Sequence, residues 1–226
     1  MIAVVTGAGR GIGRAIAIDL ARRGLDVALL ARTEAQLEET AAAVKAEGQH
    51  ALVVRCDVTS ANEVARAAEH ILEKLGPPQV VVANAGVVAR ALVSEMDEAD
   101  WDRVTGVSLK GTFLTARAFV PVMVEHKRGR FIAMGSLSST LGTARQSAYC
   151  AAKWGVVGFV KSLAEEVRGS GVQAMVVLPG GVDTAMLRES GFPAQMTAEH
   201  VARVVTFAAL DAPDAMNGSA VEMFGA

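Results

Sequence analysis

One tyrosine and one lysine stand four residues apart in a chain that uses tyrosine only once. Tyr149 and Lys153 belong to the stretch SAYCAAKWG, residues 147–155. On a helix this spacing places both side chains on one face. A phenol has a pKa near 10, but a neighbouring ammonium favours the phenolate, with an attraction of roughly 4 kcal/mol at about 4 Å before screening. We therefore expect the pKa of Tyr149 to be lowered by about two or three units, which suits proton exchange with a substrate oxygen.

The elements that must position this pair are short apolar strands alternating with longer helical patterns. The expected strands cover residues 2–7, 26–31, 51–57, 79–86, 129–136, 172–180 and 219–225. The expected helices cover 11–24, 33–48, 60–76, two stretches between 94 and 126, the stretch with Tyr149 to about 168, and 197–210. The strands are mostly continuous apolar runs, which indicates burial on both faces. The pattern predicts an α/β doubly wound Rossmann fold, with about seven parallel strands, helices on both faces and one domain over 1–226.

A glycine-rich turn separates the first expected strand from the first expected helix. It reads TGAGRGIG over residues 6–13, with Gly7, Gly11 and Gly13 in the spacing G-x-x-x-G-x-G and with Arg10 and Ile12 between them. Glycines allow the backbone to approach a pyrophosphate, and the free N–H groups of a helix N-terminus attract its charge. We interpret the turn as a nucleotide-binding site; the alternative is a purely structural turn.

The second strand predicts which dinucleotide would bind. In NAD-binding folds an acidic residue near the end of this strand binds the ribose 2′-hydroxyl. Here the strand ends at Ala31 and Arg32, without an acid. An arginine can pair with a 2′-phosphate, and Arg10 can converge on the same charge. The sequence therefore favours NADP(H), with NAD(H) as the alternative.

Composition and charge exclude several other classes of function. The net charge is −2, which gives no electrostatic reason to expect a nucleic acid or an anionic membrane as partner. The four histidines are scattered and the two cysteines have no metal-binding spacing, so we expect no metal site. No uninterrupted apolar run reaches the roughly 18 residues of a membrane span, and the chain enters an apolar strand at once. We expect a cytoplasmic protein.

Several motifs in a fixed order resemble those of one enzyme family. They are the glycine turn, CDVT at 56–59, ANAG at 83–86, YCAAK at 149–153 and LPGGVDT at 178–184, and Ser136 precedes Tyr149 by 13 residues. Together they cover nearly the whole chain. The sequence resembles the short-chain dehydrogenase/reductases, in their shorter single-domain branch. The resemblance implies an oxidoreductase that transfers hydride between a nicotinamide and a carbonyl or alcohol substrate, including 3-oxoacyl thioesters as a candidate class.

The resemblance also implies a role for each matching residue. Tyr149 would be the general acid/base, Ser136 would orient the substrate carbonyl, and Lys153 would hold the nicotinamide ribose and lower the pKa of Tyr149. The remaining cofactor contacts would be Asp57 and Val58 at the adenine, Asn84, Ala85 and Gly86 at the ribose, and Pro179, Gly180, Val182 and Thr184 at the nicotinamide.

Two features depart from the family pattern. The family commonly has an asparagine in an N-x-x-G segment that helps to hold a proton-relay water; here the segment is SLKG, with Ser108 in that place. Ser108 would either bind such a water or bond only within its own helix. The lid region, 182–196, is also short, which suggests an open or shallow site for a bulky or carrier-borne substrate. Gln146 and Met186 are the candidate substrate contacts there, with ordinary packing as the alternative.

Alternatives remain for the assembly and for the activity. The helix after Tyr149 has apolar residues on more than one face, and the resemblance implies a homodimer or homotetramer built on it. A non-catalytic NADP(H)-binding sensor and an NAD(H)-dependent alcohol dehydrogenase of the same family are the rival functions. A nucleotide-sugar epimerase or dehydratase fits less well, because the chain is short for the extra substrate domain of that branch.

Overall fold

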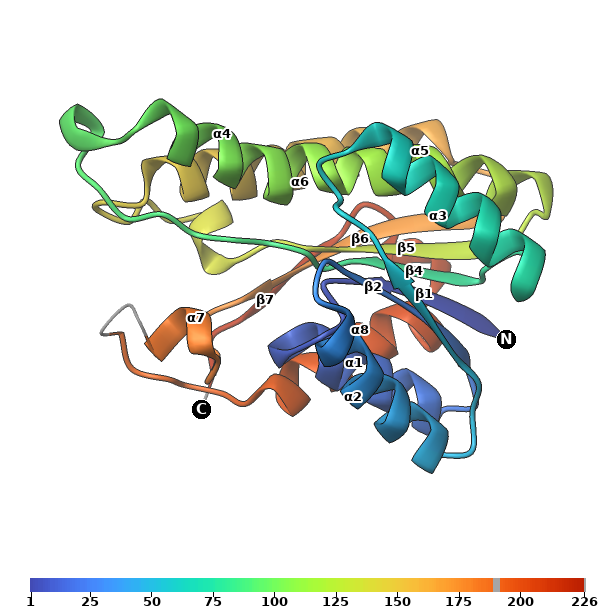
Figure 1. Cartoon of the computed structure of the whole chain (residues 1–226). Helices are drawn as coiled ribbons and strands as arrows, with labels where there is room; N and C mark the ends of the chain where they lie inside the picture. Colours follow the sequence, from blue (N-terminus) through green and yellow to red (C-terminus); the bar gives the residue numbers. More distant parts are fainter. Residues whose placement is uncertain (189–191, 226) are drawn as a thin grey trace.

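Seven parallel strands form one twisted sheet at the centre of the computed structural model, which describes residues 1–188 and 192–225 (Figure 1). The strand order is β3-β2-β1-β4-β5-β6-β7. The strands are β1 (Ile2–Thr6), β2 (Asp26–Ala31), β3 (Ala51–Arg55), β4 (Val80–Ala83), β5 (Gly129–Met134), β6 (Val172–Pro179) and β7 (Ala220–Met223). The predicted doubly wound parallel sheet is confirmed. Residue 226 and part of the predicted lid, 189–191, lie outside the described residues.

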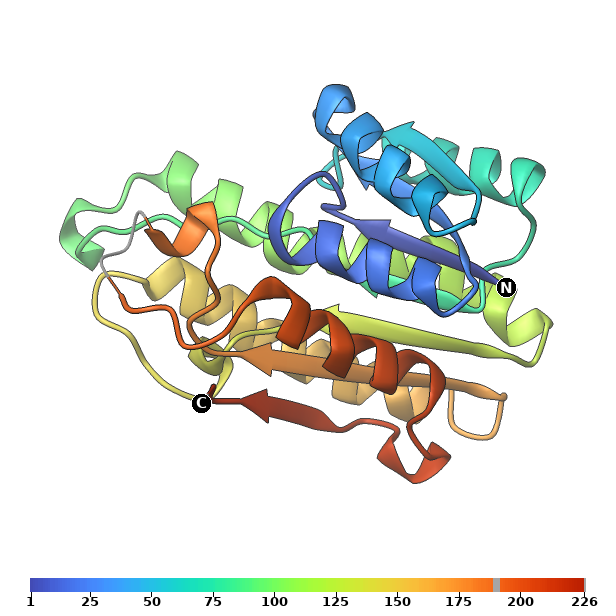
Figure 2. The same ribbon diagram turned by 90° about the horizontal axis from the view of Figure 1, so that it is seen from below.

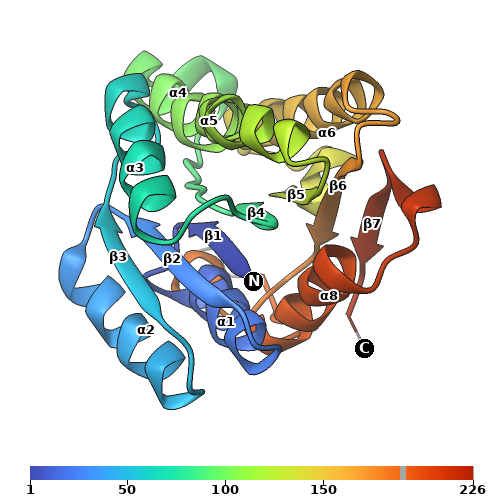
Figure 3. The same ribbon diagram turned by 90° about the vertical axis from the view of Figure 1, so that its right-hand side faces the viewer.

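Helices cover both faces of the sheet, as Figure 3 shows end-on. One face carries α1 (Gly11–Arg22), α2 (Glu34–Ala46) and α8 (Ala198–Leu210), which are in front in Figure 2. The other carries α3 (Ala61–Lys74), α4 (Glu98–Thr105), α5 (Gly111–Glu125) and α6 (Ser147–Glu166). Ile16, Leu20 and Val205 fill the first interface, and Phe119, Phe131 and Val156 the second. Burial from both sides explains the continuous apolar strands.

Every strand except β2 ends one to three residues earlier than the apolar pattern predicts, and two of these ends shape the site. Strand β4 stops at Ala83, because the N–H groups of Asn84 and Ala85 donate to the Thr6 hydroxyl, at 3.0 and 3.1 Å. Strand β5 stops at Met134, so Ser136 lies just beyond it. The polar side chains after both strands are thus placed in loops at the carboxyl edge of the sheet, where ligands of this fold class bind.

The two helical stretches expected between 94 and 126 form one continuous run. A π-helical turn, Gly106–Lys110, joins α4 to α5 and contains Ser108. This run, Glu98–Glu125, is long and apolar enough to cross a membrane by length and composition alone. In the structure, 56% of its most apolar window is buried, as in a core helix that covers a sheet.

Candidate active site

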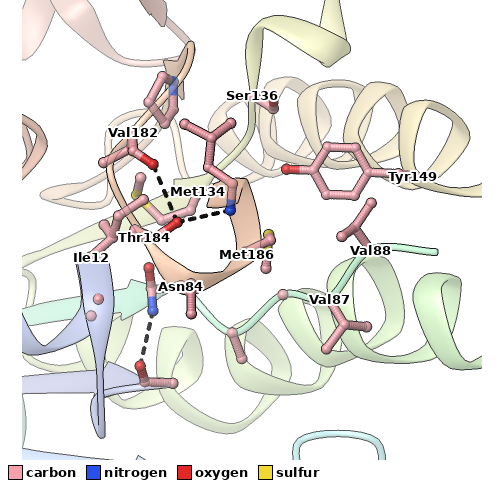
Figure 4. Close-up of a pocket in the computed structure, with 18 of the residues that line it drawn as sticks. Ile12, Asn84, Val87, Val88, Met134, Ser136, Tyr149, Val182, Thr184 and Met186 are labelled. Carbon is pink, nitrogen blue, oxygen red and sulfur yellow. Dashed lines mark hydrogen bonds between the residues drawn. The ribbon is translucent and has the colours of Figure 1, made fainter. Parts of the chain in front are cut away.

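A cavity of about 800 Å³ opens at the carboxyl ends of the strands (Figure 4). We call its two parts the glycine-turn end, formed by the Gly7–Gly13 turn with Arg32 and Asp57, and the tyrosine end, formed around Tyr149. All the site residues predicted from the sequence line this cavity except Ser108. Within the described part of the chain, no three His, Cys, Asp or Glu side chains gather where they could hold a metal ion.

The glycine turn contains positions that favour glycine, either by backbone conformation or by lack of space. Gly7 and Gly11 have φ values of +65° and +54°, in the left-handed region that favours glycine. A Cβ atom on Gly13 would lie 2.2 Å from the carbonyl oxygen of Gly7. The first turn of α1 is therefore packed directly against backbone. It begins at the cavity lining, where the free N–H groups of a helix N-terminus would stabilise an anion.

Asn84 ties this turn to the neighbouring strand. Its side-chain amide donates to the carbonyl oxygens of Thr6 at 2.9 Å and Gly7 at 3.2 Å. The same amide nitrogen would lie 2.5 Å from a Cβ on Gly13. These contacts hold the ends of β1 and β4 and the start of α1 in one arrangement. Asn84, predicted as a contact of the cofactor ribose, thus also fixes the shape of the glycine turn.

The far part of the glycine-turn end is positively charged. The side chains of Arg10 and Arg32 are exposed and line it. Asp57 is the one acidic residue among the described lining residues, and its carboxylate accepts hydrogen bonds from the N–H and hydroxyl of Thr59 at 2.9 and 2.8 Å. Burial tends to raise the pKa of Asp57, but these bonds and the charges of Arg32 and Arg55 outweigh it and lower the pKa. The residues present fit a dinucleotide with an additional phosphate.

Lys153 and Tyr149 lie on the same face of α6, as the spacing predicts. The Lys153 ammonium is buried, with 3% of the residue exposed, and Nζ donates to the carbonyl oxygen of Met134 at 2.6 Å. Nζ lies 5.7 Å from the centre of the Tyr149 ring. Burial lowers the pKa of Lys153 to about 8. The end of β5 therefore orients the ammonium beside the phenol.

The expected lowering of the Tyr149 pKa is wrong for this structure. Burial raises the pKa of Tyr149, and the opposing influence of the Ser136 hydroxyl and the Arg90 charge is smaller. The physical reason is that the phenol loses solvent in the cavity, which disfavours the phenolate. At neutral pH the phenol is therefore protonated and able to donate a proton.

Ser136 is held by the turn that follows β5. Its hydroxyl oxygen accepts a hydrogen bond from the N–H of Ser138 at 3.1 Å, and its own N–H donates to the Ser139 hydroxyl at 3.2 Å. The hydroxyl also has one O–H donor, which an oxygen in the cavity can accept. Figure 4 shows Ser136 and Tyr149 at the same end of the cavity.

Ser108 lies beneath the cavity rather than in its lining. The residue is 1% exposed, and its hydroxyl contacts the backbone N–H of Val87 at 3.4 Å and the Val87 carbonyl at 3.5 Å. The alternative that Ser108 bonds only within its own helix is therefore wrong. A Cβ on Gly86 would lie 3.5 Å from Lys153 Nζ and 3.7 Å from Ser108 Oγ, so both groups flank Gly86. A proton path through Ser108 stays a prediction.

The tyrosine end includes residues that the sequence did not single out. The predicted Gln146 and Met186 line it, and so do Thr143 and Arg90. Gln146 is 6% exposed and immediately precedes α6, while Met186 lies on the short helix α7 (Ala185–Arg188). The only available signal for Arg90 was its charge within the otherwise apolar stretch VVARALV, residues 87–93.

Comparisons with known proteins agree with this geometry. The family model described as short chain dehydrogenase matches residues 1–193. The chain is 36% identical over 236 residues to the 3-oxoacyl-(acyl-carrier-protein) reductase of Pseudomonas aeruginosa, covering 99% of this chain and 96% of that protein. It is 40% identical over 185 residues to the acetoacetyl-CoA reductase of a Synechocystis species, covering 82% and 73% respectively.

Solved structures give the same result. A short-chain type dehydrogenase/reductase from Mycobacterium marinum superposes with a TM-score of 0.94 and 28% identity, covering 99% of this chain and 94% of that one. Levodione reductase superposes with a TM-score of 0.94 and 26% identity, covering 99% and 96%. The similarity in sequence to the reductase of Pseudomonas aeruginosa and the similarity in backbone to these two structures each cover 99% of this chain.

Proposed function

We propose that this chain, which belongs to the short-chain dehydrogenase/reductase family and is an oxidoreductase, acts on acyl thioesters. It would reduce the 3-oxo group of the thioester with NADPH. One observation carries the proposal. A proton donor, Tyr149, and a hydrogen-bond donor, Ser136, face one end of a cavity whose other end is a glycine turn flanked by two arginines. This arrangement would bind a phosphorylated dinucleotide and a carbonyl compound end to end.

NADPH, when bound, would supply the hydride that reduces the substrate carbon. The Ser136 hydroxyl would donate a hydrogen bond to the carbonyl oxygen and hold it near the phenol. As negative charge develops on that oxygen, the Tyr149 O–H bond would break and its proton would complete the alcohol. The raised pKa of Tyr149 supports this direction, because the phenol enters the reaction protonated.

Lys153 would stabilise the phenolate that remains after proton transfer. Its ammonium has one donor on the Met134 carbonyl and two more that can serve the cofactor ribose and the phenolate side of the site. The lowered pKa of Lys153, about 8, means that this positive charge is lost as the pH rises through that range in the free protein. Bound phosphates would favour the charged form.

The NADP(H) preference is supported by charge at the glycine-turn end. Arg10 and Arg32 line it, and the end of β2 contributes no carboxylate there. Gln36 and Thr33, which follow Arg32, line the same region and add hydrogen-bonding groups. A 2′-phosphate would find two cations and no acid at the position where NAD-binding folds place one.

The substrate class is supported by the relatives and by the lid. The two relatives named above are reductases of 3-oxoacyl groups on a carrier protein and of acetoacetyl-CoA. A short lid over 182–196 would leave room for the thioester arm of such a carrier. We place the enzyme in the cytoplasm, and we assign the cofactor site and the catalytic site to one domain.

A homo-oligomer is part of the proposal, and it rests on an apolar surface. On α5 and α6, Phe113 and Trp154 are 41% and 54% exposed, and the Phe113 and Phe159 rings pack edge to face at 6.3 Å. Exposed aromatic residues on two adjacent helices are typical of a subunit interface. We expect a homodimer or homotetramer, which light scattering coupled to gel filtration would measure.

Oxidation of NADPH and NADH by the purified enzyme tests the proposed function. The substrates are an acetoacetyl thioester, a simple ketone and an aldehyde, each with both cofactors. We expect the highest kcat/KM for the thioester with NADPH. Tight NADPH binding without turnover of any of the three would instead favour a non-catalytic sensor, and a preference for NADH would contradict the cofactor assignment.

A further inference from the structure

Arg90 is a charged residue in the tyrosine end of the cavity with no role in the proton transfer described above. It lies in the loop between β4 and α4, four residues after Gly86, and lines the cavity together with Tyr149, Ser136, Gln146 and Met186. Its charge lies close enough to Tyr149 to act on the phenol. A guanidinium in the lining of this end can bind an acceptor on the substrate.

The backbone on both sides of Arg90 is fixed. Ala89 is buried against Ala148 and Ala152 of α6. The N–H of Ala91 donates to the carbonyl oxygen of Arg145, in the loop before α6, at 3.0 Å. The side chain therefore starts from a rigid position beside the helix that carries Tyr149, and its place in the cavity is part of the built site.

The hydrogen-bonding groups of Arg90 are only partly used. One terminal nitrogen contacts the carbonyl oxygen of Met186 on α7 at 3.4 Å, while Nε is buried and has no partner among the described residues. None of the ion pairs found in the described part of the chain includes Arg90. Asp57, the one acidic residue of the described lining, is bonded to Thr59 at the opposite end. A charged group normally has acceptors for its donors, so the guanidinium of this lining residue is left with donor capacity for a ligand.

We propose that Arg90 donates a hydrogen bond to the thioester carbonyl oxygen of a 3-oxoacyl substrate and so selects this class over simple ketones. The inference rests on the proposed function and deepens it. In a 3-oxoacyl thioester one methylene separates two carbonyl groups. When the 3-oxo oxygen lies at Tyr149 and Ser136, the second oxygen lies within a few bond lengths of it, on the part of the substrate that leads outward to the carrier. A simple ketone has no acceptor at this place and leaves the guanidinium without this hydrogen bond.

Two substrates that differ by one oxygen test the proposal. S-acetoacetyl-N-acetylcysteamine carries the thioester carbonyl, and S-(3-oxobutyl)-N-acetylcysteamine has a methylene in its place. The variant Arg90→Met keeps the length of the side chain and removes its donors. Differences in the intrinsic reactivity of the two ketones cancel, because each variant is compared with the unaltered enzyme on the same substrate.

We expect Arg90→Met to lower kcat/KM for the acetoacetyl thioester by roughly 10- to 100-fold, the size of a hydrogen bond to a charged donor. The value for the 3-oxobutyl thioether should stay within about threefold. Arg145→Met is the matched control, because Arg145 is exposed on the facing loop and does not line the cavity. It should alter neither value. If Arg90→Met does not fold, Arg90→Lys should still lower the thioester value selectively.

Several results would overturn the inference. Equal losses on both substrates with a shifted pH profile would mean that Arg90 acts through Tyr149, and no loss on either would mean that it is a packing residue. A selective loss on free acetoacetate but not on the thioester would indicate recognition of a carboxylate instead. Turnover of the thioester by the unaltered enzyme, without selectivity in the variants, would defeat only this inference; no turnover of the thioester at all would defeat the proposed function with it.

Discussion

The glycine-turn end of the cavity is formed mainly by backbone, whereas the tyrosine end is formed by side chains from separate segments. At the first, Gly13 leaves no space for a Cβ, and Asn84 bonds to two backbone carbonyls. At the second, Ser136 follows β5, Tyr149 and Lys153 lie on α6, and Arg90 comes from the loop after β4. A site made of backbone depends on glycines, which have no side chain to cover it. A site made of side chains depends on where distant segments meet.

This contrast predicts different consequences of mutation at the two ends. Changes to the glycines and to Asn84 at the glycine-turn end should alter stability and nucleotide binding together, because there the fold and the site share the same atoms. Changes at the tyrosine end should alter the reaction and keep the fold, because the side chains project from elements that are already packed. The buried charge of Lys153 is the exception that should also affect stability.

The largest effect should follow Tyr149→Phe. The substitution removes the proton donor and keeps the ring, so kcat should fall by at least about 1,000-fold. NADPH binding, measured by fluorescence titration, should change by less than about threefold. Appreciable turnover by this variant would contradict the assigned mechanism, and lost binding would mean that the two ends are not independent.

Gly13→Ala should damage both fold and binding. The new methyl group would meet the Gly7 carbonyl oxygen, so the turn must open, with a cost of about 1–3 kcal/mol in the free energy of unfolding and a loss of NADPH affinity. Gly158→Ala on α6 is the control, because no atom lies within 4 Å of that position. It should raise stability slightly. Calorimetry and NADPH titration measure both, and normal values for Gly13→Ala would refute the tight packing.

Arg32→Asp should change the cofactor preference. An acid at this place would repel a 2′-phosphate and accept a hydrogen bond from a ribose hydroxyl, so the ratio of kcat/KM for NADPH to that for NADH should fall by roughly 10- to 100-fold. Arg66→Asp, on the exposed face of α3, makes the same change in net charge away from the cavity. An unchanged ratio would remove Arg32 from the 2′-phosphate site.

Lys153→Met should stabilise the protein at neutral pH while impairing the reaction. Below pH 8 the lysine is charged when folded and bears the cost of burial; between about 8 and 10.5 the folded state releases its proton first, and the cost is relieved. The variant should therefore melt roughly 2–6 °C higher at pH 7, with an advantage that shrinks towards pH 10. Lys161→Met, exposed on the same helix, should show neither effect. An advantage that grows with pH would contradict the lowered pKa.

The smallest effect should follow Ser108→Ala. The hydroxyl makes two long contacts with the Val87 backbone, so the loss of stability should be below about 1 kcal/mol and kcat should fall by less than about threefold. Thermal melting and steady-state kinetics measure these values. A fall of 30-fold or more, with a changed solvent isotope effect, would instead show that protons leave the site through Ser108.

The expected elements were found with shifts of a few residues at their ends, and the strand order follows from the Rossmann class. The residues whose spacing carried a physical reason, such as Tyr149 with Lys153, lie together as predicted. The environment was harder to predict. The sequence indicated that Lys153 would lower the pKa of Tyr149, but burial in the folded cavity has the larger effect and raises it.

What the sequence determined by itself is local: apolar periodicity places strands and helices, glycines mark a turn, and a four-residue spacing aligns two side chains on a helix. The tertiary structure decided what depends on segments far apart in the chain. It brought Arg90 to the Tyr149 helix, buried Lys153 beneath Met134 and placed Ser108 against Val87. Periodicity and spacing act over a few residues, but burial and the partner of a polar group are set by the packing of distant elements, which no short stretch of sequence encodes.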